Sequence, residues 1–441
     1  MYVNQEKDDP KIANEFIWSI FLIFFLISSI LSISVFIFKD EIITIFAPGF
    51  LYNESQFNLA RKLLPITFPF LILVTLSSVL SSVLNVKGKF FLPSFLSVIL
   101  NVSMIIAILV FKTNAHLPLA WSMIIAGVIQ VSLLLINLSY IKIFFNLTRF
   151  GIKKLKKKLI IFIKRFLYSI MGSGIVQLNI FISMIFASLV GEGAISHIYY
   201  ADRIIDLPFA LVAVAMSITL LPYLSKNILD ENKNSEAFNQ TIIFCFIFSI
   251  PSSFGLLYLS EDIVEILFGR GEFLKEDVIY TSKVLAIYSL SLPGYMLARV
   301  CNQVFFSYER VDIPVIASFP TFISNLILCM ILYKSLGVVG LAISGAISIW
   351  LNVFIQIYFL KSQFSSFYQK IKIYNFIKTS KIISGSIAMI IAIYILDKFT
   401  YFSSIFDLFI QILIGVIVYF LTLKFMGLHE YKLIYKFKKF N

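Results

Sequence analysis

Long apolar runs dominate the chain, and each is close to the ~20 residues that an α-helix needs to cross a bilayer. Hydrophobic residues make up 59% and charged residues 14% of the 441 residues, and the mean hydropathy is +0.92. Such values lie far outside the range of soluble domains. We therefore predict an all-α polytopic membrane protein with twelve spanning helices, at approximately 13–38, 62–86, 91–111, 117–141, 166–190, 194–225, 239–260, 282–307, 313–333, 338–361, 377–397 and 402–426.

The charges in the loops between these runs predict an orientation. Residues 142–165 contain nine lysines and arginines and no acid, whereas residues 261–277 contain six acids. Because basic loops stay on the cytoplasmic side, we expect both termini, including the basic C-terminal tail, in the cytoplasm. This bias and attraction to anionic lipids account for the net charge of +13. Nucleic-acid binding is disfavoured, because the basic stretch is a short linker between spans.

Residues for catalysis or metal binding are sparse. Each of the three cysteines, Cys245, Cys301 and Cys329, falls inside an apolar run, so we interpret all three as small core residues. The only histidines, His116, His197 and His429, are far apart in sequence. The first run is too long for a signal-peptide core and lacks a small-residue cleavage site. We predict neither a metal site nor catalytic residues, and therefore not an enzyme.

An internal repeat with an offset of 221 residues divides the chain. Residues 40–45 align with 261–266, and, after one residue of drift, 119–122 align with 341–344. Chance similarity among apolar helices is the alternative. Parallel repeats are a transporter architecture with the substrate path between two lobes. The repeat predicts an N-lobe of four helices at 1–145, a basic cytoplasmic linker at 146–165, a six-helix C-lobe at 166–362, and a C-terminal hairpin with a basic tail at 363–441.

The two copies differ in helix number. Subtracting the offset from the start of the C-lobe gives 166 − 221 = −55, so the first lobe is expected to lack its two opening helices. An even number of missing helices leaves the orientation unchanged.

Several motifs carry a family resemblance. They are Ala47–Phe50, Thr67–Pro69, Leu92–Phe95, Asn101–Ile105, Tyr199–Arg203, Leu220–Lys226 and Leu267–Phe273. With these motifs the chain resembles the MviN/MurJ-type lipid II flippases, a branch of the multidrug/oligosaccharidyl-lipid/polysaccharide (MOP) exporter superfamily. The resemblance implies fourteen helices in the complete family, arranged as two six-helix lobes and a C-terminal hairpin. The resemblance and the repeat together lead us to expect that this sequence lacks the first two helices, which carry most of the essential cavity arginines and an essential aspartate in the family.

Charged residues inside spans are the candidate site. The insertion free energy of a charged residue at the centre of a membrane helix is unfavourable by ~2.5–3.5 kcal/mol on insertion scales. A charge inside a span therefore indicates a functional role. The resemblance makes Arg203 a cavity arginine that grips a diphosphate; the alternative is an intrahelical pair with Asp206. Asp202 is expected to orient an arginine or join ion coupling, or else to form a plain salt bridge. Arg299, where the family often has lysine, is a second substrate-binding candidate, with snorkelling or pairing as the alternative.

Prolines and neutral polar residues complete the candidates. Pro208 is expected to bend its helix, with Asp206 capping the opening, and Pro93 and Pro222 are further structural prolines. The eighth span lacks the proline that the family has near Cys301. For the polar residues inside spans we favour interhelical hydrogen bonding; these are Asn101, Gln130, Gln177, Asn179, Asn325 and Asn352.

The resemblance implies a transport function. The cargo would be lipid II, an undecaprenyl-diphosphate-linked peptidoglycan precursor, moved across the bacterial inner membrane by alternating access. We expect no cofactor, a cycle reset by an ion gradient or the membrane potential, and membrane lipids and cell-wall synthesis proteins as partners. The alternatives are a same-superfamily exporter of another lipid-linked oligosaccharide or a drug, and a truncated inactive remnant.

Overall fold

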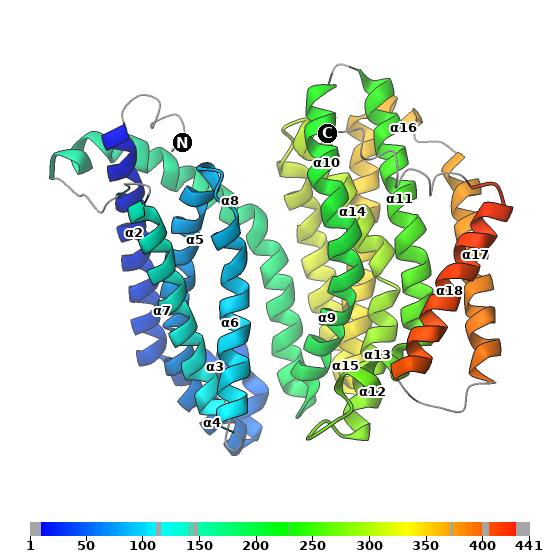
Figure 1. Cartoon of the computed structure of the whole chain (residues 1–441), viewed down its shortest axis with the longest axis horizontal. Helices are drawn as coiled ribbons and strands as arrows, with labels where there is room; N and C mark the ends of the chain where they lie inside the picture. The colour runs from blue at the N-terminus through cyan, green and yellow to red at the C-terminus, as the bar shows by residue number, and fades with distance from the viewer. Residues whose placement is uncertain are drawn as a thin grey trace. The chain divides into compact units, whose positions relative to one another are not determined.

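The computed structural model describes residues 10–111, 116–140, 143, 149–228, 230–370, 374–398 and 405–428, and in these ranges it contains helices and no β-strand (Figure 1). Backbone groups have no water to bind inside a bilayer, so a spanning segment satisfies them within its own helix. The predicted all-α membrane fold is therefore confirmed. The helices form two compact units, Met1–Ile170 and Met171–Asn441.

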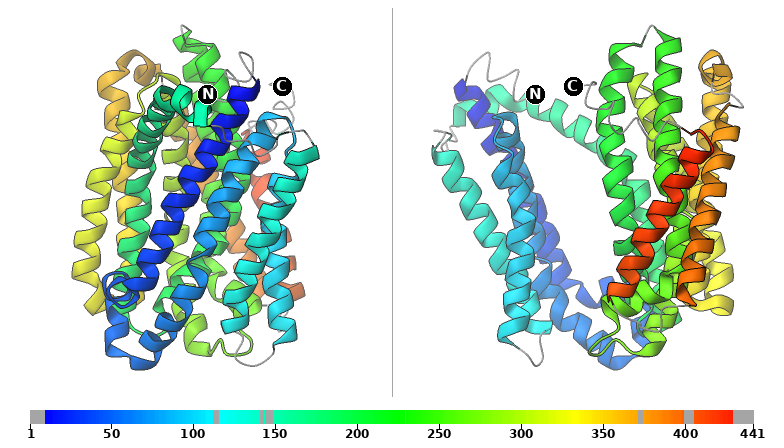
Figure 2. Two further views of the ribbon diagram at one scale, coloured as in Figure 1. Left: turned by 90° about the vertical axis from the view of Figure 1, so that its left-hand side faces the viewer. Right: turned by 45° about the vertical axis from the view of Figure 1, so that its right-hand side comes forward.

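Unit 1 is built around α7, which packs against α4, α5 and α6, while α2 packs against α5 (Figure 2). Its core contains Ile17 and Trp18 of α2, Leu80 and Leu84 of α5, and Leu134 of α7. The elements of this unit are α2 (Pro10–Ile37), α3 (Lys39–Phe46), η1 (Pro48–Tyr52), α4 (Glu54–Thr67), α5 (Phe70–Val86), α6 (Phe91–Val110), α7 (His116–Tyr140) and the first part of α8 (Arg149–Val190).

Unit 2 has a larger core, to which most of its helices contribute. The hairpin of α17 and α18 packs on α11 through α17, and the Tyr419 hydroxyl of α18 donates to the Ile247 carbonyl at 2.7 Å (Figure 1). The elements that follow α8 are α9 (Ala194–Phe209), η2 (Ala210–Val214), α10 (Ala215–Lys226), α11 (Glu231–Tyr258), α12 (Ser260–Phe268), α13 (Lys275–Ser289), α14 (Leu292–Ser307), α15 (Asp312–Gln363), α16 (Ser365–Lys370), α17 (Tyr374–Asp397) and α18 (Ile405–Phe425).

Much of the apolar surface faces outward, as expected for helices in lipid. On α6, Ala107 is the only buried residue, whereas Ile105 and Leu109 are 55% and 68% exposed. Among the described residues, eight helices are long and apolar enough to span a membrane, and α13 with α14 forms a ninth span bent by 43°. The membrane class of the protein follows from these helices.

Two predicted spans share one helix. α15 has 52 residues and would be about 78 Å long if straight, which is more than twice a bilayer core. It breaks at Gly337, where φ is 57° and ψ is −136°. Glycine tolerates this backbone conformation because it has no Cβ. The two halves therefore correspond to the predicted spans at 313–333 and 338–361.

The predicted single helix at 194–225 is wrong in detail. α9 ends at Phe209, and the π-helical segment η2 separates it from α10. Pro208 lacks the N–H that would continue the hydrogen-bond ladder of α9, and a wider turn follows it. The predicted basic linker is helical where the structure describes it. From Arg149 onward its residues belong to α8, which continues into the predicted span at 166–190. His429 and the basic C-terminal tail lie outside the described residues.

Candidate substrate-binding site

Arg203 lies on the exposed face of α9 between two neighbours of the same helix. Its Nη1 is 3.4 Å from Asp206 Oδ2, and its guanidinium carbon is 4.6 Å from the centre of the Tyr199 ring. Residues three and four positions apart share one face of a helix, which explains this stack. The side chains of Arg203 and Asp206 are 58% and 60% exposed. The intrahelical pair is thus present, but it is long for a charge-assisted hydrogen bond and leaves guanidinium donors accessible.

Asp202 is next to Arg203 but projects in another direction, about 100° round the helix. Its side chain is exposed, and none of the ion pairs in the described part of the chain includes it. The salt bridge that we gave as the alternative for Asp202 is not observed there.

Arg299 contacts a different helix. It lies on α14, and its Nε donates a hydrogen bond to Ser217 Oγ of α10 at 3.3 Å. The Ser217 hydroxyl in turn donates to the Ala213 carbonyl at 2.7 Å. This partner is neutral, and within the described ranges no carboxylate pairs with Arg299. The contact of Arg299 with α10 is therefore a hydrogen bond to a hydroxyl and not an ion pair.

The three structural prolines occupy different positions. Pro208 is the second-last residue of α9, and η2 begins two residues after it. Pro222 lies inside α10, two-thirds of the way along it. Pro93 is the third residue of α6, in the first turn, where a proline removes no intrahelical hydrogen bond.

Four of the six neutral polar residues predicted to bond between helices do so, namely Gln130, Asn179, Asn325 and Asn352, whereas Asn101 and Gln177 are exposed. In unit 2, Asn325 Nδ2 donates to Asn179 Oδ1 at 2.8 Å, which links α15 to α8. Asn352 Nδ2 donates to Thr321 Oγ1 at 3.2 Å across the two halves of α15. In unit 1, Gln130 Nε2 donates to the Leu96 carbonyl at 2.8 Å. The three cysteines are buried, as predicted for core residues, and are free thiols. The described residues contain no group of metal-ligating side chains.

The comparisons with known proteins decide the family. The family model described as "Lipid II flippase MurJ" matches residues 1–413 of this chain. The chain belongs to the MurJ family of lipid II flippases.

Individual members of the MurJ family match over most of this chain. A protein of Buchnera aphidicola subsp. Schizaphis graminum, named "Probable lipid II flippase MurJ", is 32% identical over 96% of this chain and 84% of its own length. A protein of Aquifex aeolicus with the same name is 34% identical over 64% of this chain and 55% of its own length. As the MurJ family is a family of transporters, this chain is a multi-pass bacterial membrane protein of the transporter class.

Solved structures agree with this family. A structure titled "Lipid II flippase MurJ, inward closed conformation" matches with a TM-score of 0.80 and 28% identity, covering 94% of this chain and 84% of the other. An inward-facing multidrug resistance MATE transporter of the MOP superfamily matches with a TM-score of 0.62 and 15% identity, covering 81% of this chain and 82% of the other. The second likeness shows the shared fold alone.

Two residues that contact the candidate arginines were not predicted from the sequence. Tyr199 is four residues before Arg203, so helical spacing alone could have predicted the stack. Ser217 is 82 residues from Arg299, and only tertiary packing brings the two together. The π-helical segment η2 has no local signal apart from Pro208.

Proposed function

We propose that this member of the MurJ family moves an undecaprenyl-diphosphate-linked peptidoglycan precursor from the inner to the outer leaflet of the bacterial inner membrane. Arg203 would bind the diphosphate, and the two units would move in alternating access. An ion gradient or the membrane potential would reset the cycle. Both termini would lie in the cytoplasm, because the basic loops are on that side.

The exposed guanidinium of Arg203 on the helix α9 carries this proposal. A planar guanidinium forms paired hydrogen bonds with phosphate oxygens, whereas an ammonium acts as a point charge. The 3.4 Å contact with Asp206 is weak enough to be exchanged for a phosphate. The Tyr199 ring, 4.6 Å from the guanidinium carbon, stabilises the Arg203 side chain in the orientation observed and would reduce the ordering cost when cargo binds.

Complementation of cells depleted of their own lipid II flippase tests the proposal. We expect Arg203→Ala to abolish growth and Arg203→Lys to give partial growth, because lysine keeps the charge without the paired geometry. Arg310→Ala is the matched control: this exposed arginine lies in the turn before α15, outside α9, and pairs with Asp312 at 2.8 Å. Membrane levels of each variant are measured by quantitative immunoblotting.

Two results would contradict the proposal. Full growth of the Arg203→Ala cells at normal protein level would remove Arg203 from cargo binding. Failure of the unaltered chain to support growth, although it is present in the membrane, would favour another cargo or an inactive protein. Leaflet-specific labelling of lipid II in the same cells shows directly whether lipid II reaches the outer leaflet.

A further inference from the structure

The helices of unit 1 recur in unit 2 at the offset of the internal repeat. Adding 221 to the bounds of α2, Pro10–Ile37, gives the bounds of α11, Glu231–Tyr258. In the same way α3 corresponds to α12, α4 to α13, α5 to α14 and α6 to the first half of α15, each within one residue at its start. α7 corresponds to the half of α15 that follows Gly337. The two units therefore share one order of helices.

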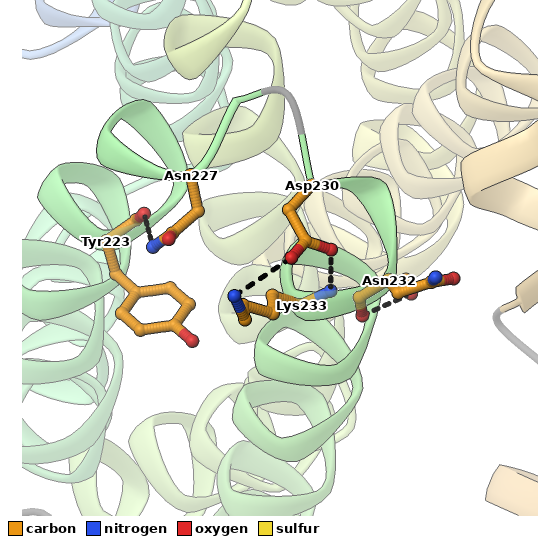
Figure 3. Close-up of polar contacts among 6 residues, drawn as sticks. Tyr223, Asn227, Asp230, Asn232 and Lys233 are labelled. Atoms are coloured by element: carbon orange, nitrogen blue, oxygen red, sulfur yellow. Dashed lines mark hydrogen bonds and ion pairs between the residues drawn. The ribbon is translucent and has the colours of Figure 1, made fainter.

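Unit 2 contains a helix, α10, that has no counterpart among the described residues of unit 1. α10 packs against α14 and α11, and Arg299 of α14 donates to Ser217 of α10 at 3.3 Å. α10 ends close to the start of α11, where Asp230 accepts from the Lys233 backbone N–H at 3.1 Å (Figure 3). In unit 1 the corresponding face belongs to α5 and α2.

A groove of about 680 Å³ lies on that face of unit 1. Its walls are α2, α5 and the part of α8 that belongs to unit 1, and we call it the α2–α5 groove. Ser78, which lines the groove, is the residue that the offset of 221 aligns with Arg299. Most of the lining is apolar and includes Phe16, Phe24 and Phe162. The groove thus lies where unit 2 holds α10.

A second groove, of about 510 Å³, lies between α5, α6 and α7, and we call it the α5–α6 groove. In unit 2 the counterpart of α6 contacts α8, because Asn325 of α15 donates to Asn179 of α8 at 2.8 Å. The offset aligns Asn325 with Met104 of α6. Leu100 and Ser97 line the groove and lie four and seven residues before Met104, on the same face of α6. The groove thus lies where unit 2 holds the spanning part of α8.

The α5–α6 groove contains buried hydroxyls that are not hydrogen-bonded. Ser77 and Ser81 both line it, one helical turn apart, and Ser77 is 3% exposed. Neither hydroxyl has a hydrogen-bond partner within the described ranges. Ser78 and Ser82 of the same helix instead donate to carbonyls of α5, at 2.8 and 2.7 Å. A buried hydroxyl without a partner is unfavourable, so this groove is complementary to a surface that offers hydrogen bonds.

The two grooves call for two neighbouring helices. A hydrocarbon chain would leave the hydroxyls of Ser77 and Ser81 unpaired, whereas a membrane helix with small and hydrogen-bonding side chains pairs with such groups. Ser78 lines both grooves, so α5 is their common wall. Helices that occupy both grooves would therefore be adjacent, as in a helical hairpin.

From these correspondences we infer that unit 1 binds a membrane-spanning helical hairpin of a partner protein in its two grooves. The first helix offers hydrogen bonds to Ser77 and Ser81, and the second packs small and apolar side chains on the α2–α5 groove. The second helix ends beside Pro10, as α10 ends beside the start of α11. The inference does not rest on the transported cargo, because binding of the hairpin is measured without transport.

Site-specific photo-cross-linking in membranes tests the inference. The full chain is co-expressed with a tagged probe, which consists of the two opening helices of the family taken from the Buchnera aphidicola subsp. Schizaphis graminum relative. Benzoylphenylalanine replaces Leu100 in the α5–α6 groove or Val79 in the α2–α5 groove. The control position is Ile105, which is 55% exposed on α6 and lines neither groove. We expect adducts with the probe from Leu100 and Val79 and none from Ile105.

Two pairs of serine variants test the chemistry of the α5–α6 groove. Ser77→Ala/Ser81→Ala should raise the probe concentration for half-maximal adduct formation about eightfold, from ~0.6 kcal/mol for each of two interhelical hydrogen bonds. Without the probe, the same variant should unfold at the same or a higher temperature, because it removes two unpaired hydroxyls. The matched control, Ser78→Ala/Ser82→Ala, removes hydroxyls that bond within α5 and should leave adduct formation unchanged.

Several outcomes would overturn the inference. Adducts from Ile105 as abundant as those from Leu100 would show that the probe has no seat, and adducts with lipid alone would show grooves filled by acyl chains. Adducts with a second copy of the chain would indicate a homo-oligomer instead. Equal effects of the two serine pairs would exclude the predicted hydrogen bonds. Intact mass of the native protein that includes the hairpin in the same polypeptide would exclude a partner.

Discussion

His197 of α9 and Asp277 of α13 lie side by side, with His197 Nε2 2.9 Å from Asp277 Oδ1. The histidine side chain is 6% exposed and stacks on the Tyr280 ring at 5.7 Å. Asp277 also caps α13, because its second oxygen accepts from the Leu274 N–H at 2.8 Å. One carboxylate thus fixes both the start of α13 and its contact with the helix that carries Arg203.

Removing this contact should destabilise unit 2. We expect His197→Ala to lower the free energy of unfolding by about 1–3 kcal/mol, since a buried hydrogen bond is lost. Asp277→Asn should cost less, because an amide oxygen can still accept the Leu274 N–H. Urea denaturation in detergent micelles, followed by tyrosine fluorescence, compares the variants. If His197→Ala were as stable as the unaltered chain, the pair would have no structural role.

The break in α15 at Gly337 predicts that adding one methyl group to this residue destabilises the protein. Gly337→Ala forces alanine into a sparsely populated backbone region and should cost about 1–3 kcal/mol of unfolding free energy. Gly345→Ala is the matched control on the same helix: an added Cβ there would meet Tyr288 Cε1 at 3.7 Å, an ordinary contact. Thermal unfolding measures both variants. A lower midpoint for Gly345→Ala than for Gly337→Ala would contradict the strain argument.

The hydrogen bond between Asn325 and Asn179 predicts an energetic coupling. A double-mutant cycle with Asn325→Ala and Asn179→Ala should give about 0.6 kcal/mol, with ~1.7 kcal/mol as the upper end for membrane helices. The control cycle pairs Asn179→Ala with Asn352→Ala, which bonds to Thr321 instead. That cycle should be additive. Equal coupling in both cycles would mean that the variants perturb unit 2 as a whole.

The sequence predicted the helices well because apolar length in a bilayer leaves few alternatives. The spans at 313–333 and 338–361 flank the break that the structure places at Gly337. The interhelical role of Asn325 could also be predicted, since a polar amide inside a span needs a partner. The identity of that partner could not, because Asn179 is 146 residues away.

Only the charged residues of the candidate site and a contact within one helix could be predicted from the sequence. Charge inside an apolar run singled out Arg203 and Arg299, and helical spacing predicted the contact with Asp206. The Ser217 contact of Arg299 depends on how α10 packs against α14, which no local pattern encodes.

The π-helical segment η2 also sets the direction in which the side chains of α10 project around the helix axis. A π turn holds about one residue more than an α turn, so side chains after Val214 are rotated by roughly 100° relative to a regular continuation of α9. A helical-wheel projection drawn through residues 194–226 would therefore misassign the faces of Ser217 and Lys226. Deleting a single residue from η2 would reset this phase. It would turn Ser217 away from Arg299 while leaving every side chain of α10 chemically intact.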